Sequence, residues 1–260
     1  MQGFRQKLLS IGIVLVLFVI FILYSAPASL IKPALGMWFP QLVLANSAGT
    51  IWHGTATQAW FSHAGKSAAL GELEWRLSPI SILLLHPQLE LQTRAAAQAL
   101  NTRVSASPMG KITVSELQAN FPLSILRPWY PLLLDGEVSV DLEDLVYRGN
   151  WVQQLEGSAE LTSAQWKMGR DSVLLGNYQA QLAMAGEEVL VSLSDQDANL
   201  GVNGTLQLAQ SGDYQTDLFF EERAATVAPI FQFLSFIAQA NDGGLVLNTR
   251  GNLNGRAANR

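Results

Sequence analysis

Histidine and carboxylate side chains are the groups of this chain from which a metal site or an acid–base pair would be built. The sequence holds three histidines, His53, His63 and His86, and no cysteine. A zinc ion needs three or four converging nitrogen, sulfur or oxygen ligands, and no two histidines have the spacing that places both on one helix face. We therefore interpret them as solvated or hydrogen-bonded residues, and we predict neither a metal site nor a bound cofactor.

Glu72 with Glu74, and Asp141 with Glu143, are carboxylate pairs that would share one strand face, and Glu143–Asp144, Glu187–Glu188 and Glu221–Glu222 are adjacent in sequence. General acid–base catalysis needs carboxylates in a partly desolvated cleft, with pKa values that lie apart. Here the acids alternate with apolar residues, which is typical of the solvated face of a strand. The sequence also lacks the nucleophile elbow, the Walker loop and the dinucleotide-binding glycine pattern. We therefore predict no catalytic residues and a protein that is not an enzyme.

Other polar and aromatic groups have weaker interpretations. Residues 201–204, Gly-Val-Asn-Gly, indicate a turn and not a phosphate cradle. Trp129 and Tyr130 lie in a proline-broken stretch, and either line a ligand surface or wedge against a sheet edge, the commoner use. Most tryptophans lie in strand-like stretches and predict core packing. Trp38, Trp52 and their neighbours alternatively form an apolar docking patch near a membrane.

An uncharged apolar segment lies near the N-terminus, over residues 8–25. About 20 such residues cross a bilayer as a helix. Arg5 and Lys7 precede the segment and no acid does, so the positive-inside rule keeps the N-terminus in the cytoplasm. The alternative is a cleaved signal peptide ending near the small residues of 26–28, although the apolar run is longer than is usual for one.

These signals divide the chain into a cytoplasmic N-terminus (1–7), a transmembrane signal anchor (8–28) and an exported body (29–260). Because the chain has no cysteine, the body must be stable without disulfides. This is compatible with a bacterial periplasm. The formal net charge is −5, with 16 Lys and Arg residues. This composition argues against nucleic-acid binding, which needs a dense basic surface.

Strict alternation of apolar and polar residues predicts that the body is mainly β. The pattern is clearest over residues 72–77, where Leu73, Trp75 and Leu77 share one face, and it returns over 137–143. One wet face indicates antiparallel sheet. Further runs with this alternation cover residues 88–92, 176–182, 206–208 and 245–249.

Two short helices are also predicted, over residues 121–133 and 226–240. The first stretch is apolar but broken by prolines. The second has apolar residues at helical spacing, with Thr226 as its N-cap and Pro229 in its first turn.

Three landmarks recur in the same order and suggest a duplication. The glycine turn near Gly54 returns at Gly157, and Leu70-Gly71 returns at Leu175-Gly176. The apolar stretch before Asp135-Gly136 returns before Asp242-Gly243. We predict two β-units, 49–145 and 155–253, each with a short helix before its closing strand. The alternative is that any β protein punctuated by glycines aligns with itself this well.

The order of these features resembles the type II secretion system protein N family. The resemblance rests on the N-terminal apolar segment and on motifs spread over nearly the whole chain: GTIWHG (49–54), LGELEWRLSPISILL (70–84), PLSILRPWYPLLLDGEV (122–138), LLGNYQAQL (174–182) and GGLVLNTRGNL (243–253). It implies a single-pass accessory protein of the bacterial inner membrane that assists export of folded proteins across the outer membrane. It also implies partners within that system, the inner-membrane platform and secretin-linked proteins, and no catalytic residues.

Two functional hypotheses remain open. A scaffold or adaptor would bind its partners through exposed strand edges. A membrane-tethered β-groove that binds or transports lipid, similar to AsmA-like proteins, would need an open apolar trough along both units. A packed interior closed by Trp75 and its neighbours would exclude the groove. A periplasmic hydrolase is the least supported alternative.

Overall fold

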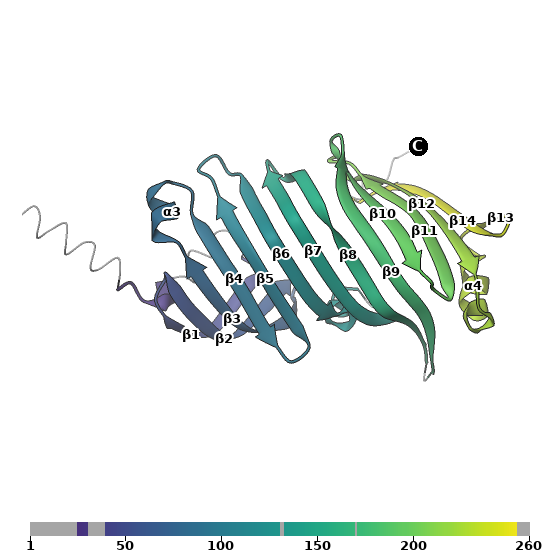
Figure 1. Cartoon of the computed structure of the whole chain (residues 1–260), viewed down its shortest axis with the longest axis horizontal. Coiled ribbons are helices and arrows are strands. Elements are labelled where there is room, and N and C mark those ends of the chain that lie inside the picture. Colours follow the sequence, from purple (N-terminus) through teal and green to yellow (C-terminus); the bar gives the residue numbers. More distant parts are fainter. Residues whose placement is uncertain (1–24, 31–39, 131–132, 170, 254–260) are drawn as a thin grey trace, which may run out of the picture.

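The body of the chain forms one large antiparallel sheet. The computed structural model describes residues 25–30, 40–130, 133–169 and 171–253, and all fourteen strands within them are hydrogen-bonded into this sheet (Figure 1). The alternating pattern of the sequence therefore produces the mainly β, antiparallel architecture that it predicts, and this part of the prediction is confirmed.

The strands follow one another closely along the chain. Those of the N-terminal half are β1 (Leu42–Gly49), β2 (His53–His63), β3 (Lys66–Leu77), β4 (Gln88–Ala95), β5 (Gln98–Ala106), β6 (Ile112–Pro122) and β7 (Leu134–Arg148). Those of the C-terminal half are β8 (Trp151–Met168), β9 (Asp171–Ala185), β10 (Glu188–Gln196), β11 (Leu200–Leu208), β12 (Asp213–Glu222), β13 (Gln239–Asn241) and β14 (Gly244–Asn252). The short helical segments are η1 (Ala28–Leu30), α3 (Pro79–Leu83), η2 (Leu123–Leu126), η3 (Ala225–Val227) and α4 (Ala228–Leu234).

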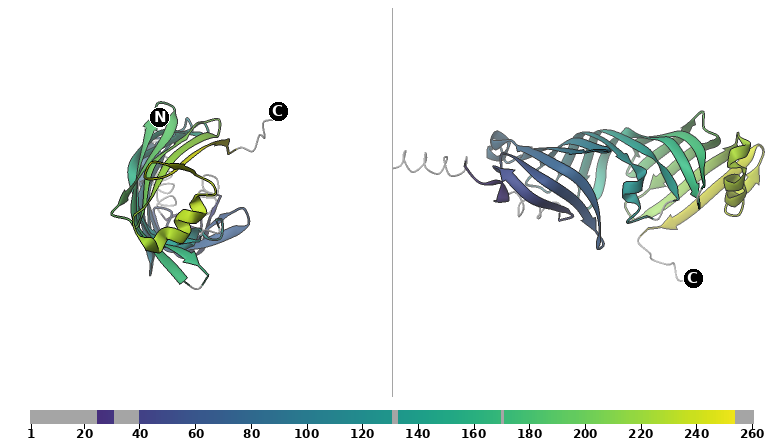
Figure 2. Two further views of the ribbon diagram at one scale, coloured as in Figure 1. Left: turned by 90° about the vertical axis from the view of Figure 1, so that its right-hand side faces the viewer. Right: turned by 90° about the horizontal axis from the view of Figure 1, so that it is seen from below.

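Neighbours in the sheet are neighbours in sequence from β1 to β12, and the order then ends β12-β14-β13. The sheet is strongly curved, so one face is concave, and α4 lies on that concave side (Figure 2). Alternation sends apolar side chains to the concave face and charged ones to the convex face. In β3, for example, Leu73 and Trp75 are buried while Arg76 is exposed.

Two helices and one turn differ from the sequence-based expectation. Of residues 121–130 and 133, only Leu123–Leu126 form a helix, a 3-10 turn, since prolines interrupt the stretch. The second helix is preceded by η3 and its N-cap is Val227, so the prediction of Thr226 as the cap is wrong. Residues 201–204 lie inside β11. Gly204 is there because a Cβ would lie 2.0 Å from the Asp217 carbonyl oxygen of the next strand.

The predicted transmembrane segment lies almost entirely outside the described residues. Only residues 25–28 of it are described, where Ala28 is buried. No helix within the ranges given above is long and apolar enough to cross a membrane. The anchor therefore stays a prediction from sequence.

Buried side chains form one cluster in each half of the sheet. The first contains Ala56, Leu73, Trp75, Leu91 and Val104, and the second contains Tyr178, Phe220, Val227 and Ile230 among others. The clusters lie far apart in the strand order, so the sheet has two core regions and not one.

Trp75 is the largest fully buried side chain described, and Gly54 makes room for it. A Cβ at Gly54 would lie 2.4 Å from the Trp75 ring. The indole nitrogen donates a hydrogen bond to the Thr50 carbonyl oxygen at 3.3 Å. Of the two glycines in the 49–54 motif, Gly49 has φ of 93° and shapes the turn, whereas Gly54 permits this packing.

We predict that Trp75→Ala lowers the free energy of unfolding by about 3–5 kcal/mol, because it leaves a cavity beneath Gly54. Gln92→Ala, on the outer face of the neighbouring strand, should change it by less than about 0.5 kcal/mol. Urea denaturation of the full chain in detergent, followed by circular dichroism, measures both. Equal effects of the two substitutions would contradict the assignment of Trp75 as a core residue.

Candidate apolar binding surface

One line of paired residues crosses the concave face from β2 to β14. Residues directly opposite one another in antiparallel strands have their side chains on the same face. We call this line the apolar strip, and its members in strand order are Ala56, Leu73, Thr93, Leu100, Ala119, Val140, Ala159, Ala180, Leu193, Gly204, Leu218 and Leu247. None is charged, and Thr93 alone carries a polar side chain.

Exposure changes along the apolar strip. Near the N-terminal end Ala56 and Leu73 are buried within the cluster around Trp75. From Val140 onward the members are only partly buried. The strip is therefore packed at its beginning and accessible over its middle and second half.

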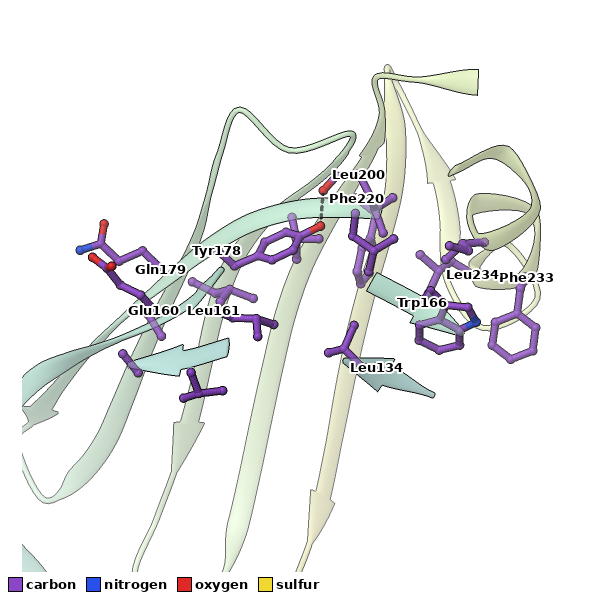
Figure 3. Close-up of a pocket in the computed structure, with 17 residues that line it drawn as sticks. Leu134, Glu160, Leu161, Trp166, Tyr178, Gln179, Leu200, Phe220, Phe233 and Leu234 are labelled. Atoms are coloured by element: carbon purple, nitrogen blue, oxygen red, sulfur yellow. Dashed lines mark hydrogen bonds between the residues drawn. The ribbon is translucent and has the colours of Figure 1, made fainter. Parts of the chain in front are cut away.

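The larger cavity lies over the second half of the strip and has a volume of about 330 Å³. Ala159, Ala180 and Leu193 of the strip form part of its wall. Figure 3 shows Phe233 and Leu234 of α4 beside Trp166, on the side of the cavity opposite Tyr178. Short apolar side chains on the strip and a helix beside it thus create a space that only apolar groups would fill favourably.

A smaller cavity of about 190 Å³ lies over the first half of the strip. It is lined by Thr93, Leu100 and Ala119 of the strip, and by residues in and just after η2. Trp129 lines it and packs edge-on against Phe61, with ring centroids 5.6 Å apart. The Trp129 indole also donates a hydrogen bond to the His63 carbonyl oxygen at 2.9 Å. Trp129 therefore lines an apolar surface, whereas Tyr130 is exposed and is not part of the lining.

Polar groups next to the larger cavity are paired with one another. The Tyr178 hydroxyl donates to the Leu200 carbonyl oxygen at 2.8 Å. Asp195, opposite Tyr178 in the sheet, has a side chain that is 4% exposed. Its carboxylate accepts hydrogen bonds from Arg223 and from the Asn203 side chain, the latter at 2.8 Å. The Asp195 carboxylate is thus paired with a cation, which limits its effect on the apolar character of the cavity.

The pKa values of these two groups reflect their surroundings. Burial raises the pKa of the Asp195 carboxyl, but hydrogen bonds from Arg223 and Asn203 outweigh it, so the pKa lies below its ordinary value. Burial, followed by the nearby Asp195 charge, raises the pKa of Tyr178 well above its ordinary value. At neutral pH the site therefore holds a carboxylate, a guanidinium and a neutral phenol.

The histidines and acids considered from sequence lie apart from this surface. His53 is near Glu74, with Nε2 and Oε1 3.1 Å apart, and Arg76 bonds the same carboxylate. Hydrogen bonds from His53 and then Arg76 lower the pKa of Glu74. Asp141 and Glu143 are exposed. Within the described part of the chain no three His, Asp or Glu side chains gather in a way that could hold a metal ion.

Sequence analysis did not find the pairing of Asp195 with Arg223, nor the two cavities. Tyr178 and Trp166 were each recognised only as members of strands. Asp195 itself is the one feature of the sequence that could indicate this pairing, since an acid at an inward position of β10 breaks the apolar alternation of that strand. Trp38, part of the alternative docking patch, lies outside the described residues, and Trp52 is partly buried.

We predict that Asp195→Asn lowers the free energy of unfolding at neutral pH by about 1.5–3 kcal/mol, because Arg223 then faces a neutral amide. The folded-state pKa of Asp195 is depressed. Its charge therefore stabilises the fold above the unfolded-state pKa of about 3.9, and this contribution is lost as the pH falls through the folded-state pKa. Denaturation of the full chain at neutral pH and at about pH 3 should show the two proteins converging at the lower pH.

Glu188→Gln in the same strand is the control, since Glu188 is exposed. It should leave stability at neutral pH nearly unchanged. A constant difference between Asp195→Asn and wild type across this pH range would contradict a stabilising Asp195 charge.

Comparisons with known proteins agree with the sequence motifs. The model of the family "Type II secretion system (T2SS), protein N" matches residues 40–248. A type II secretion system protein N from Aeromonas hydrophila is 23% identical over 221 residues, covering 81% of this chain and 84% of the relative. One from Vibrio cholerae serotype O1 is 24% identical over 211 residues, covering 78% and 81%.

No solved structure matches the chain. The family match begins just before β1 and ends within β14, so it spans nearly the whole sheet. The resemblance inferred from the motifs is confirmed, and the chain belongs to the type II secretion system protein N family.

Proposed function

We propose that this chain is a non-catalytic accessory protein of type II secretion, anchored in the bacterial inner membrane by residues 8–28 with its sheet in the periplasm. Family membership carries the proposal, because the match extends over nearly the whole sheet. The uncharged N-terminal segment and the basic residues before it support the orientation. In this role the protein assists the export of folded proteins by binding other components, the inner-membrane platform and secretin-linked proteins.

The edge of the sheet at β14 is the surface we propose for these partners. β13 pairs only with Gly244, Leu245 and Val246. Along residues 247–251 no other described strand lies on that side of β14. An extended segment of a partner could add there as a further strand, with main-chain hydrogen bonds supplying the affinity.

We predict that deletion of the gene lowers the secretion of the host's type II exoproteins. We further expect a photo-crosslinking amino acid at Arg250, an exposed residue of this edge, to capture another secretion component in intact cells. Gln181, exposed in the middle of the sheet, is the control position and should capture none. Unchanged secretion after deletion would contradict the accessory role, and equal capture at both positions would contradict the edge.

We also propose that the sheet arose by duplication of one unit, over 49–145 and 155–253. Each half has a buried alanine opposite a glycine of positive φ at a β-bulge, Ala59 with Gly71 and Ala164 with Gly176. Each half leads from its fifth strand through a short helix to its last strand. The sequence separation between Phe61 and Trp166 equals the separation between Trp129 and Leu234. The first residue of each pair lines the smaller cavity and the second lines the larger one.

A second candidate function, lipid binding, is favoured by the apolar strip. At the beginning of the sheet the interior around Trp75 is packed, and a second buried cluster lies in the C-terminal half. Beyond the region around Trp75, apolar side chains of the strip remain accessible, and two cavities lie over them. Monomeric proteins rarely expose a large apolar surface to water. A surface of this kind would bind an acyl chain along the concave face.

For this candidate we predict that Ala180→Glu lowers the phospholipid that co-purifies with the full chain by at least about tenfold, since it places a charge in the apolar strip. Gln181→Glu puts the same charge on the opposite face and should leave the amount unchanged. Mass spectrometry of extracts, normalised to protein, measures both. Absence of lipid from the wild-type protein, or equal losses in the two variants, would count against lipid binding.

A further inference from the structure

The connection between β3 and β4 exposes a group of aliphatic side chains. We call residues 80–85 the aliphatic tip. Ile80 is 70% exposed, and Leu83 and Leu84 are 83% and 71% exposed. Leu85 is 69% exposed, and Ile82 is exposed to a lesser degree. Single exposed leucines are common on protein surfaces, but a contiguous group such as this marks a site of interaction.

Local hydrogen bonds hold the aliphatic tip in its outward position. Pro79 starts α3, and the Ser78 side chain accepts a hydrogen bond from the Ser81 amide. The Ser81 hydroxyl donates to the Ser78 carbonyl oxygen at 2.6 Å and accepts from the Gln88 amide at 2.8 Å. The His86 amide donates to the Ser81 carbonyl oxygen at 2.8 Å. These bonds satisfy the Ser81 hydroxyl and several backbone amides within the segment, which lowers the cost of surrounding the aliphatic side chains of its tip with an apolar medium.

The charge pattern around the tip is equally one-sided. Between Arg76 and Glu90 the sequence contains no Asp, Glu, Lys or Arg. Nor does this segment contain Trp, Tyr or Phe. Protein interfaces are usually anchored by aromatic residues and arginine. A tip built from Ile and Leu with a single Ser fits hydrocarbon better than it fits a protein surface.

Its position in the fold places the tip close to the end of the N-terminal apolar segment. Pro27 pairs with Thr50, and the Ile51 amide donates to the Ala26 carbonyl oxygen at 3.1 Å. The same hairpin connects to the end of β3, where the Leu77 amide donates to the Trp52 carbonyl oxygen at 2.7 Å. α3 begins two residues later, at the end of the sheet that carries β1 and β2 (Figure 1).

We propose that the aliphatic tip inserts into the periplasmic interface of the bilayer that holds the proposed anchor (8–28), as a second membrane contact of the sheet. This inference rests on the proposed membrane anchor. α3 has five residues and is too short to span a bilayer. It would lie at the boundary of headgroups and acyl chains, where an apolar surface enters to a depth of about 5–10 Å. The two contacts together fix the orientation of the sheet relative to the membrane.

Because the chain has no cysteine, one environment-sensitive nitrobenzoxadiazole dye can be attached at Leu84→Cys in the full-length protein. The protein is reconstituted into vesicles of phosphatidylethanolamine and phosphatidylglycerol that contain nitroxide-labelled lipid. We expect a nitroxide near the headgroup to quench the dye at least about twofold more strongly than one at the chain end. The dye at Phe236→Cys, an equally exposed apolar position after α4, should not be quenched by either lipid.

A second variant tests the cause of insertion. Leu83→Asp in the Leu84→Cys background adds a charge to an exposed position, so the fold should persist by circular dichroism while quenching falls to the level of Phe236→Cys. Flotation of the vesicles in alkaline carbonate reports separately on the anchor. A dye at Leu84→Cys that stays unquenched on protein that floats overturns the aliphatic tip as a membrane contact and leaves the anchor standing. If alkaline carbonate extracts the protein from the vesicles, both the anchor and the membrane contact of the aliphatic tip are overturned. If Leu83→Asp leaves the quenching unchanged, the apolar side chains of the tip are not the cause of insertion.

Discussion

Backbone hydrogen bonds join every strand from β1 to β14 into one sheet, and the apolar face depends on how neighbouring strands are paired. Side chains alternate between faces with a period of two, so a slip of one residue would move a strand's apolar set into water. Bulges adjust the pairing where the alternation in sequence fails, and two of them keep apolar residues on the concave face. Glu116 has φ of 53° and lies at a bulge of β6 against β5, which lets Val114 and Leu117 share the concave face. Ser163, with φ of 52°, does the same for Leu161 and Ala164.

The sheet is curved because a long antiparallel sheet twists. Its β-bulges increase the bending. The concave face then carries more apolar surface than the sheet itself can bury. At the N-terminal end Trp75 fills this space, and near the C-terminal end α4 covers part of it. Between these two regions the apolar strip stays accessible, which is why cavities form beside the short helices.

Two paired carboxylates, Asp195 and Asp135, stabilise the sheet. Asp195 is held by Arg223 and Asn203 at the end of a strand next to the larger cavity. Asp135 connects η2 and β8, because it pairs with Arg127 at 2.9 Å and with Lys167 at 2.6 Å. The hydrogen bond from Lys167 is the main cause of the lowered pKa of Asp135. Both carboxylates thus stabilise the boundaries of the apolar face.

The sequence by itself determined the mainly β, antiparallel class, six of the alternating runs, the lack of recognisable catalytic motifs and the family, because these depend on local alternation and short motifs. The pairing of Asp195 with Arg223 depends on strands that the fold brings together, so only the tertiary structure decided it. The same holds for the apolar strip, since the bulges at Glu116 and Ser163 are invisible in a period-two pattern. The leucines of residues 83–85 were readable as an apolar run, but only the fold leaves them uncovered, because exposure depends on what the rest of the chain packs against.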